Sequence, residues 1–351
     1  MLFDLVRPFL HAVDAEQAHR LTIGALKVGV HPRQGEPDPT SLAVQLFGLS
    51  FPNPLGMAAG FDKNAEVPDA LIALGFGFTE AGTVTPRPQA GNPKPRIFRL
   101  PRDRGVINRL GFNNDGHVAV LGRLEARAGR GGIVGVNIGA NKDSDDMAAD
   151  YVLGLAAFYG LASYFTVNIS SPNTPGLRGL QARAPLDDLI GRLIEARAKL
   201  TDDGDAPTPL LVKIAPDLTD EQLADIAAVC VERQVDGVII SNTTLSRDGL
   251  EDGNAGEQGG LSGAPLFELS TRVLADFARA TERRVPLVGV GGVTSAETAY
   301  AKITAGASLV QLYTGLVYDG PELVAEIKRG LAEALERDGF RSVAEAVGAK
   351  L

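Results

Sequence analysis

Eight short apolar runs, each followed by a polar or glycine-rich turn and then a helix-like stretch, constrain the fold of this 351-residue chain more than any other feature. The runs cover residues 55–59, 76–81, 133–138, 165–169, 210–214, 237–241, 287–290 and 309–313. Apolar runs with helical connections indicate parallel strands that are buried on both faces. Eight such units predict an α/β fold, a (β/α)8 or TIM barrel, with a doubly wound open sheet as the structural alternative.

The first thirty residues predict a small N-terminal helical hairpin domain. Apolar residues recur at helical spacing over 2–13, and Asp14 can cap a second helix, with Gln17 placed as in a capping box. Gly29 can end that helix. Residues 31–43 begin with a segment too rich in helix breakers to be helical, and they are expected to form a linker. Residues 44–351 are then the barrel domain.

Three segments interrupt the repeating pattern. Residues 44–54 are typical of a hairpin before the first barrel strand, and 96–112 of a strand, a turn and a strand between the second and third. Residues 243–263 are polar and glycine-rich. A loop of this length in a compact enzyme is usually functional or mobile.

Charge and composition exclude several classes of function. The formal net charge of −9 argues against nucleic-acid binding, which relies on clustered Lys and Arg. The single cysteine, Cys230, rules out an internal disulfide and a thiolate metal cluster, and the four histidines lack ligand spacing, so no bound metal is expected. This cysteine usage fits a cytoplasmic setting. Neither a signal peptide nor a stretch of transmembrane length is predicted.

Amide side chains gather where the predicted strands end. Barrel enzymes place their sites at the C-terminal ends of the strands. Asn108, Asn137, Asn168, Asn173 and Asn242 all fall at such ends or in the 96–112 insert. Because an amide both donates and accepts hydrogen bonds, a ring of amides suits an imide such as a pyrimidine, although any single one can serve only a turn.

Glycines follow the last two strands, at 289, 291, 292 and 315. Loops at these positions often bind phosphate through backbone N–H groups, and tight turns are the alternative explanation. Lys63 and Lys213 also end strands, where a lysine can form a Schiff base, hold an anion or stabilise developing negative charge. Ser171 needs a relay or a desolvated setting to act as a base, and otherwise it is a turn hydroxyl. No histidine lies in these motifs, which argues against a Ser-His-Asp hydrolase.

Nine motifs distributed along the chain resemble those of a known family. They read AAGFDKN, GTVTPRPQAGNPKPRIFRLP, INRLGFNN, VNISSPNTPGLR, VKIAPD, SNTT, GGLSG, GVGG and VQLYTG. In order and spacing they are similar to those of class 2 dihydroorotate dehydrogenases, over nearly the whole chain. A serine at 171, where other classes carry cysteine, and the N-terminal helical extension both point to class 2.

The resemblance implies an FMN-dependent oxidation of dihydroorotate to orotate in pyrimidine biosynthesis. Ser171 would be the catalytic base that removes the C5 proton, while the C6 hydride passes to flavin N5. Lys213 would lie near the flavin N1/O2 edge and stabilise the reduced anion. The implied FMN contacts are Ala59, Gly60, Thr83, Asn137, Asn168, Lys213, Ser241, Gly263, Gly292, Tyr313 and Thr314. The implied substrate contacts are Lys63, Asn108, Arg109, Leu110, Gly111, Phe112, Asn168, Asn173, Asn242 and Thr243, with the loop 108–112 closing over the substrate.

The resemblance also implies a second half-reaction with a membrane quinone. The quinone would enter a tunnel between the hairpin and the barrel, lined by His19, Arg96 and Tyr313. The protein would be a peripheral membrane protein on the cytoplasmic side of the inner membrane, with the hairpin in contact with lipid. Three alternatives remain: a flavin barrel acting on another pyrimidine, a Schiff-base aldolase using Lys213 or Lys63, and a non-catalytic membrane-peripheral module.

Overall fold

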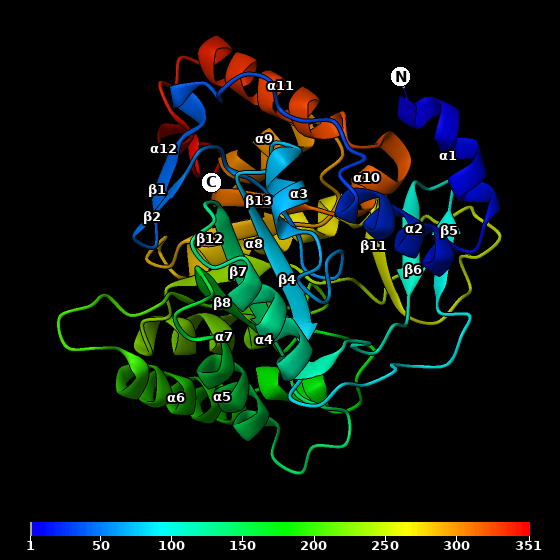
Figure 1. Cartoon of the computed structure of the whole chain (residues 1–351). Coiled ribbons are helices and arrows are strands. Elements are labelled where there is room, and N and C mark those ends of the chain that lie inside the picture. The colour runs from blue at the N-terminus through cyan, green and yellow to red at the C-terminus, as the bar shows by residue number, and fades with distance from the viewer. Residues whose placement is uncertain (1) are drawn as a thin grey trace.

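A closed barrel of eight parallel strands forms the centre of the molecule, as the computed structural model of residues 2–351 shows (Figure 1). Adjacent strands pair in chain order, and the last pairs with the first to close the barrel. The strands are β3 Leu55–Met57, β4 Phe78–Val84, β7 Ile133–Ile138, β8 Tyr164–Asn168, β9 Leu210–Ile214, β10 Gly237–Ile240, β12 Leu287–Val290 and β13 Ala307–Leu312. The predicted (β/α)8 barrel is confirmed, and each predicted run contains or overlaps one strand.

Burial on both faces explains why the strands were readable as continuous apolar runs. Every residue of β4, β8, β9, β10 and β12 is buried. Helices cover the outside of the barrel: α3 Pro68–Ala73, α4 Gly116–Ala126, α5 Met147–Phe158, α6 Arg183–Leu200, α7 Asp220–Glu232, α8 Phe267–Ala280, α9 Ala296–Thr304, α11 Leu323–Arg337 and α12 Val343–Ala346. The short helix α10 Thr314–Asp319 follows β13 at the barrel mouth. Short 3-10 turns span Thr40–Leu42, Leu177–Gln181 and Ala264–Leu266.

A second, three-stranded antiparallel sheet lies beside the barrel mouth (Figure 1). Strands β5 Ile97–Leu100 and β6 Gly105–Asn108 confirm the predicted strand, turn and strand. The third strand, β11 Gly260–Gly263, lies at the end of the segment 243–263, which was predicted only as a long loop. Its sequence, GLSG, has little intrinsic strand preference, so pairing with β6 determines its conformation.

Two helices form the N-terminal hairpin, α1 Leu2–Ala12 and α2 Ala15–Lys27. The Asp14 carboxylate caps α2 by accepting from the backbone N–H groups of Glu16 and Gln17, at 3.1 and 3.0 Å. The reciprocal bond from the Gln17 side chain, which a capping box requires, is absent within residues 2–351. The chain then runs without helix over 31–39. Strands β1 Val44–Leu46 and β2 Leu49–Phe51 form the predicted hairpin.

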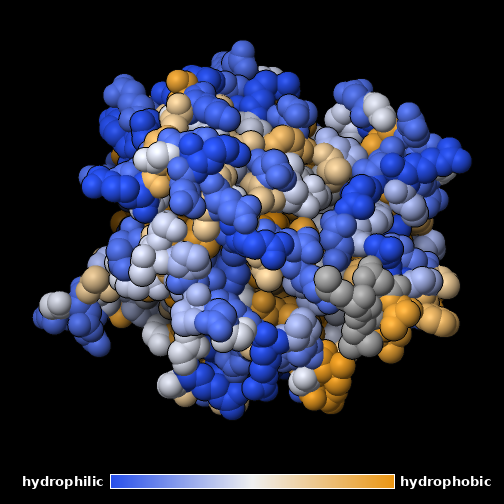
Figure 2. All heavy atoms as spheres, turned by 90° about the horizontal axis from the view of Figure 1, so that it is seen from above, coloured by the Kyte–Doolittle hydropathy of each residue, from blue (hydrophilic) through white to orange (hydrophobic). Residues whose placement is uncertain are grey.

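Apolar side chains of the hairpin remain exposed. Leu5 and Phe9 of α1 are 73% and 74% exposed, and Leu21 of α2 is 59% exposed. Figure 2 shows orange, apolar residues gathered at the lower right of the view. Among the helices described, none has the length and hydrophobicity needed to span a bilayer.

One buried histidine makes the stability of the fold depend on pH. His117 of α4 packs edge-on against Phe158 with ring centroids 5.1 Å apart, and its Nε2 has no hydrogen-bond partner in the described part of the chain. Burial therefore lowers the pKa of His117 from 6.5 to about 4. Between these values the unfolded chain binds the proton and the folded chain does not, so stability falls as pH decreases.

We expect His117→Leu to flatten the pH dependence of stability between pH 6.5 and 4. The depressed pKa of His117 corresponds to at most about 3 kcal/mol of stability lost by pH 4. Urea unfolding at pH 8, where the wild-type ring is neutral, and at pH 5 measures the difference. Equal losses in the two proteins would show that His117 does not cause the acid sensitivity.

Candidate active site

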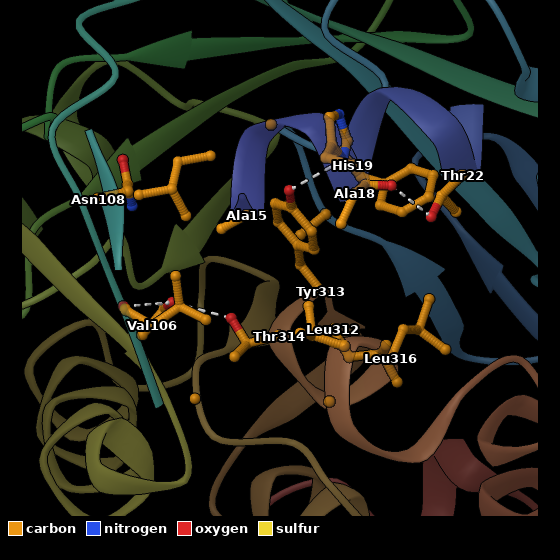
Figure 3. A pocket seen from close by; sticks show the side chains of 18 of the residues that line it. Ala15, Ala18, His19, Thr22, Val106, Asn108, Leu312, Tyr313, Thr314 and Leu316 are labelled. Atoms are coloured by element: carbon orange, nitrogen blue, oxygen red, sulfur yellow. Dashed lines mark hydrogen bonds between the residues drawn. The ribbon is translucent and has the colours of Figure 1, made fainter. Parts of the chain in front are cut away.

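One continuous cavity of about 1110 Å³ extends from the C-terminal ends of the barrel strands to the N-terminal hairpin. Its inner part is lined by polar side chains such as Ser171 and Lys213, and its outer part by apolar residues of α1 and α2. Figure 3 shows residues of α2, with His19 among them, facing Tyr313 and Leu316 across the cavity. The barrel mouth and the hairpin therefore line one continuous cavity.

Most of the residues implied by the resemblance line this cavity. They are His19, Ala59, Gly60, Lys63, Thr83, Asn108, Leu110, Gly111, Phe112, Asn168, Ser171, Asn173, Lys213, Ser241, Asn242, Thr243, Gly263, Gly292, Tyr313 and Thr314. Three do not line it. Asn137 lies behind Thr83, Arg109 bonds Glu257, and Arg96 is buried against Glu16 of α2. The roles of all these residues stay predictions.

A chain of hydrogen bonds connects a carboxylate inside the barrel to the amides of the site. Glu80 of β4, fully buried, accepts from Asn137 Nδ2 at 2.8 Å. Asn137 Oδ1 accepts from Thr83 Oγ1 at 2.5 Å, and Thr83 Oγ1 accepts from Asn168 Nδ2 at 2.8 Å. Asn168 Oδ1 in turn accepts from Asn242 Nδ2 at 3.3 Å. The sequence predicted only that these amides lie close together, and the structure links Asn137, Asn168 and Asn242 through one chain of hydrogen bonds.

Two further groups complete the environment of Glu80. The hydroxyl of Tyr164 donates to this carboxylate at 3.1 Å and the amide of Gln311 at 2.9 Å. Buried carboxylates are stable only when their oxygens are well supplied with donors. Sequence reasoning did not identify Glu80, although an acidic residue inside the otherwise apolar run 76–81 was a signal for a buried polar centre.

Lys213 presents an unpaired cation to the cavity. Its side chain is 5% exposed, and it makes no hydrogen bond or ion pair within residues 2–351. Burial lowers the pKa of Lys213, and the negative charge of Glu80 partly opposes this shift. A buried ammonium without a partner favours an anionic or electron-rich ligand.

Lys63, His19 and Tyr313 lie between the inner and outer parts of the cavity. Burial lowers the pKa of Lys63 to about 8 and the pKa of His19 to about 3, the latter assisted by the Lys63 charge. His19 is therefore neutral at physiological pH. Its Nδ1 lies 3.5 Å from the Tyr313 hydroxyl, and both rings meet Phe61 edge-on. Phe61 was not identified from the sequence.

Ser171 lies in a loop fixed by its neighbours. Its Oγ is buried and accepts from the backbone N–H of Asn173 at 3.2 Å. Arg178 donates to the carbonyls of Ser170 and Thr243, both at 3.0 Å, and pairs with Asp217. This guanidinium ties three strand-end loops together. No histidine or carboxylate bonds Ser171 within the described residues, so a base at this position needs another group or water to accept the serine's own proton.

The loop 108–112 contacts the serine loop directly. Asn173 Nδ2 donates to the Asn108 carbonyl at 3.1 Å, and Asn92 Nδ2 donates to the carbonyls of Asn173 and Arg109. The Thr174 hydroxyl, in the serine loop, is buried and has no hydrogen-bond partner among the described residues. It was not identified from the sequence because a lone threonine in a proline-rich turn carries no distinctive pattern.

The hairpin is attached to the barrel by a buried ion pair. Arg96 donates to both oxygens of Glu16, at 3.0 and 2.8 Å, and Lys94 lies 3.2 Å from the same carboxylate. These bonds hold the pKa of Glu16 at about 2. Arg99 adds bonds to the carbonyls of Leu10, His11 and Val13. The outer cavity therefore has a fixed wall.

Two glycines that follow β12 line the cavity. Gly291 and Gly292 have φ of 102° and 74°, a region that side chains rarely adopt. A Cβ on Gly292 would lie 2.4 Å from Phe267 Cβ. The N–H of Gly292 makes no hydrogen bond within residues 2–351. An unpaired N–H beside a cavity is suited to an anion such as phosphate.

Comparisons with known proteins agree with this geometry. The sequence model of the family "Dihydroorotate dehydrogenase" matches residues 41–335. A dihydroorotate dehydrogenase (quinone) of Parvibaculum lavamentivorans is 62% identical over 99% of this chain and 98% of its own length. That of Brucella anthropi is 62% identical over 97% and 93%.

Solved structures give the same result. The crystal structure of DHODH from Eimeria tenella in complex with ferulenol has a TM-score of 0.92 and 42% identity, covering 95% of both chains. The ligand-free structure from the same organism has a TM-score of 0.92 and 41% identity. The barrel, the polar strand ends and these matches together lead to one conclusion: the chain belongs to the dihydroorotate dehydrogenase family.

Proposed function

We propose that this protein oxidises dihydroorotate to orotate in pyrimidine biosynthesis and passes the electrons to a quinone. The observation that carries this function is the single cavity, which joins an amide-rich polar end to an apolar outer end beside the hairpin. A polar pyrimidine and a long apolar acceptor need different surroundings, and this cavity supplies both. Family membership excludes the aldolase and the non-catalytic module that the sequence had left open.

The family is flavin-dependent, and we infer that the flavin of this chain is FMN. Two features support the choice: the unpaired Lys213 ammonium and the unpaired N–H of Gly292, which fit the ring and the phosphate respectively. When bound, the flavin accepts a hydride and later releases two electrons. The set of FMN and substrate contacts implied by the resemblance is part of this proposal.

The oxidation removes two hydrogens from neighbouring carbons. The proton of the C5–H bond would pass to Ser171 Oγ as the serine hydroxyl releases its own proton toward solvent, and the C5–H electron pair would form the C5=C6 double bond. A bound flavin would supply the acceptor for the C6 hydride. Ser171 is buried, and Arg178 holds its loop in place. Phe112, which lines the cavity, keeps water from the reacting carbons.

The outer cavity serves the quinone. His19 is neutral and Tyr313 has a pKa raised by burial, so the passage carries no charge at these two positions. The exposed apolar residues of the hairpin would contact lipid, which makes the protein peripheral to the cytoplasmic side of the inner membrane. The division into hairpin, linker and barrel domains belongs to the same proposal.

We expect the purified protein to be yellow and to release FMN on denaturation. Dihydroorotate should bleach the flavin absorbance under anaerobic conditions, and a quinone should restore it. Chromatography of the released flavin identifies the cofactor, and the visible spectrum follows both half-reactions. A colourless protein that FMN does not reconstitute would overturn the assignment, while a flavin that another pyrimidine base bleaches faster would change the substrate.

A further inference from the structure

A buried lysine lies behind the glycine loop that lines the cavity. Lys302 of α9 is fully buried and its side chain passes beneath β12, where its Cδ lies 2.9 Å from the Cβ position of Gly289. It does not line the cavity. No carboxylate lies within 4 Å of its ammonium in the described chain, and Glu268 contributes only a distant charge. Burying such a cation without a paired anion costs free energy.

Hydroxyl groups connect this ammonium to the loop. Lys302 Nζ donates to Ser270 Oγ at 2.8 Å and to Thr271 Oγ1 at 3.0 Å, and it lies 5.3 Å from the centre of the Phe267 ring. Because the Ser270 oxygen accepts from the ammonium, its one proton is available to the Gly291 carbonyl at 3.0 Å, which shares it with the Phe267 carbonyl at 3.1 Å. The positive charge of Lys302 is thereby connected through Ser270 to the backbone carbonyl of Gly291.

The direction of this bond determines what the loop presents to the cavity. In a planar trans peptide the carbonyl and the following N–H point in opposite directions. Ser270 draws the Gly291 carbonyl toward α8, so the N–H of Gly292 is turned the other way. Both glycines line the cavity, and this N–H has no partner in the described residues.

We propose that Lys302 is a positioning residue for the cofactor phosphate, acting through Ser270 on the Gly291–Gly292 peptide and supplying a buried positive charge behind it. The proposal rests on the FMN assignment above. Burial lowers the pKa of Lys302 to about 7, and a bound phosphate would provide the negative charge that the ammonium otherwise lacks.

The test compares two flavins that differ only in the phosphate. Fluorescence titration of the full-length protein, stripped of flavin, gives dissociation constants for FMN and riboflavin. We expect Lys302→Met to weaken FMN binding by about 10- to 100-fold, the range for losing charge-assisted hydrogen bonding. Riboflavin binding should change by less than about threefold. The preference for FMN is therefore the measured quantity.

A matched control separates this role from general stability. Lys328 of α11 is also buried, but it bonds Gln34, the Gly75 carbonyl and Asp38. Lys328→Met should lower the melting temperature without changing the preference for FMN. If Lys302→Met fails to fold, Ser270→Ala tests the same connection and should also reduce the preference.

Each outcome has a clear meaning. Loss of the FMN preference in Lys302→Met or Ser270→Ala, with riboflavin binding retained, supports the proposal. An unchanged preference, or an equal loss for both flavins, overturns it while leaving the FMN assignment intact. A wild-type protein that binds riboflavin as tightly as FMN overturns both.

Discussion

Ser171→Ala should slow reduction of the bound flavin by dihydroorotate by about 10²- to 10⁴-fold, the usual cost of losing a general base. The side chain lies in the polar end of the cavity, its Oγ is buried, and within residues 2–351 its one hydrogen bond comes from the backbone N–H of Asn173. Its removal deletes one small hydroxyl and leaves the amides in place. Orotate binding should therefore change little, and stopped-flow absorbance measures both properties.

A second substitution tests the chemical role of the same position. Ser171→Cys restores a group that can accept the C5 proton, so it should recover part of the rate lost in Ser171→Ala. A steeper rise of the Cys variant's rate with pH would follow from the lower pKa of a thiol. Near-normal flavin reduction in Ser171→Ala would mean that this hydroxyl only shapes its turn.

Removing the hairpin should separate the two half-reactions. The polar end of the cavity is built by the barrel and the β5–β6–β11 sheet, whereas α1 and α2 line only the outer part. Deletion of residues 1–30 should leave single-turnover reduction by dihydroorotate largely intact. Turnover with a long-chain quinone and binding to liposomes should both fall strongly, because an apolar substrate needs an apolar route from the bilayer.

The deletion also leaves Arg96 without Glu16, so bound flavin content must first show that the truncated protein is folded. A milder variant avoids this cost. Leu5→Ser with Phe9→Ser alters only exposed apolar side chains, and Val118→Ser, at a still more exposed position on α4, is its control. Unchanged liposome binding and quinone turnover in both the deletion and the double variant would show that the hairpin only packs against the rest of the protein.

The sequence predicted the eight barrel strands because parallel strands buried on both faces read as continuous apolar runs, although the runs alone also fit a doubly wound open sheet. A strand such as β9, with every residue buried, reads as an unbroken apolar run, and its neighbours do the same. Strand β11 has no recognisable strand pattern in its sequence, because its conformation comes from pairing with β6. Segments whose structure depends on distant partners are not readable from local preference.

The sequence predicted which residues form the site, but not which residues they bond to. Strand-end motifs identified Lys213, Asn168 and Ser171, since the topology of a barrel brings those ends together. The sequence contained no indication that Arg96 would bind Glu16 rather than line the cavity. Pairings across 80 residues depend on the packing of the hairpin, which periodicity alone does not specify.

Glu80 has a consequence for the selectivity of the whole site. A carboxylate can only accept hydrogen bonds, so Asn137 gives it the NH₂ end and has only its oxygen left for Thr83. The same constraint passes to Asn168 and then to Asn242. None of these amide groups can exchange the positions of its oxygen and its NH₂ group without breaking hydrogen bonds to its neighbours. The buried Glu80 carboxylate thus fixes the pattern of hydrogen-bond donors and acceptors that a pyrimidine meets, before any ligand binds.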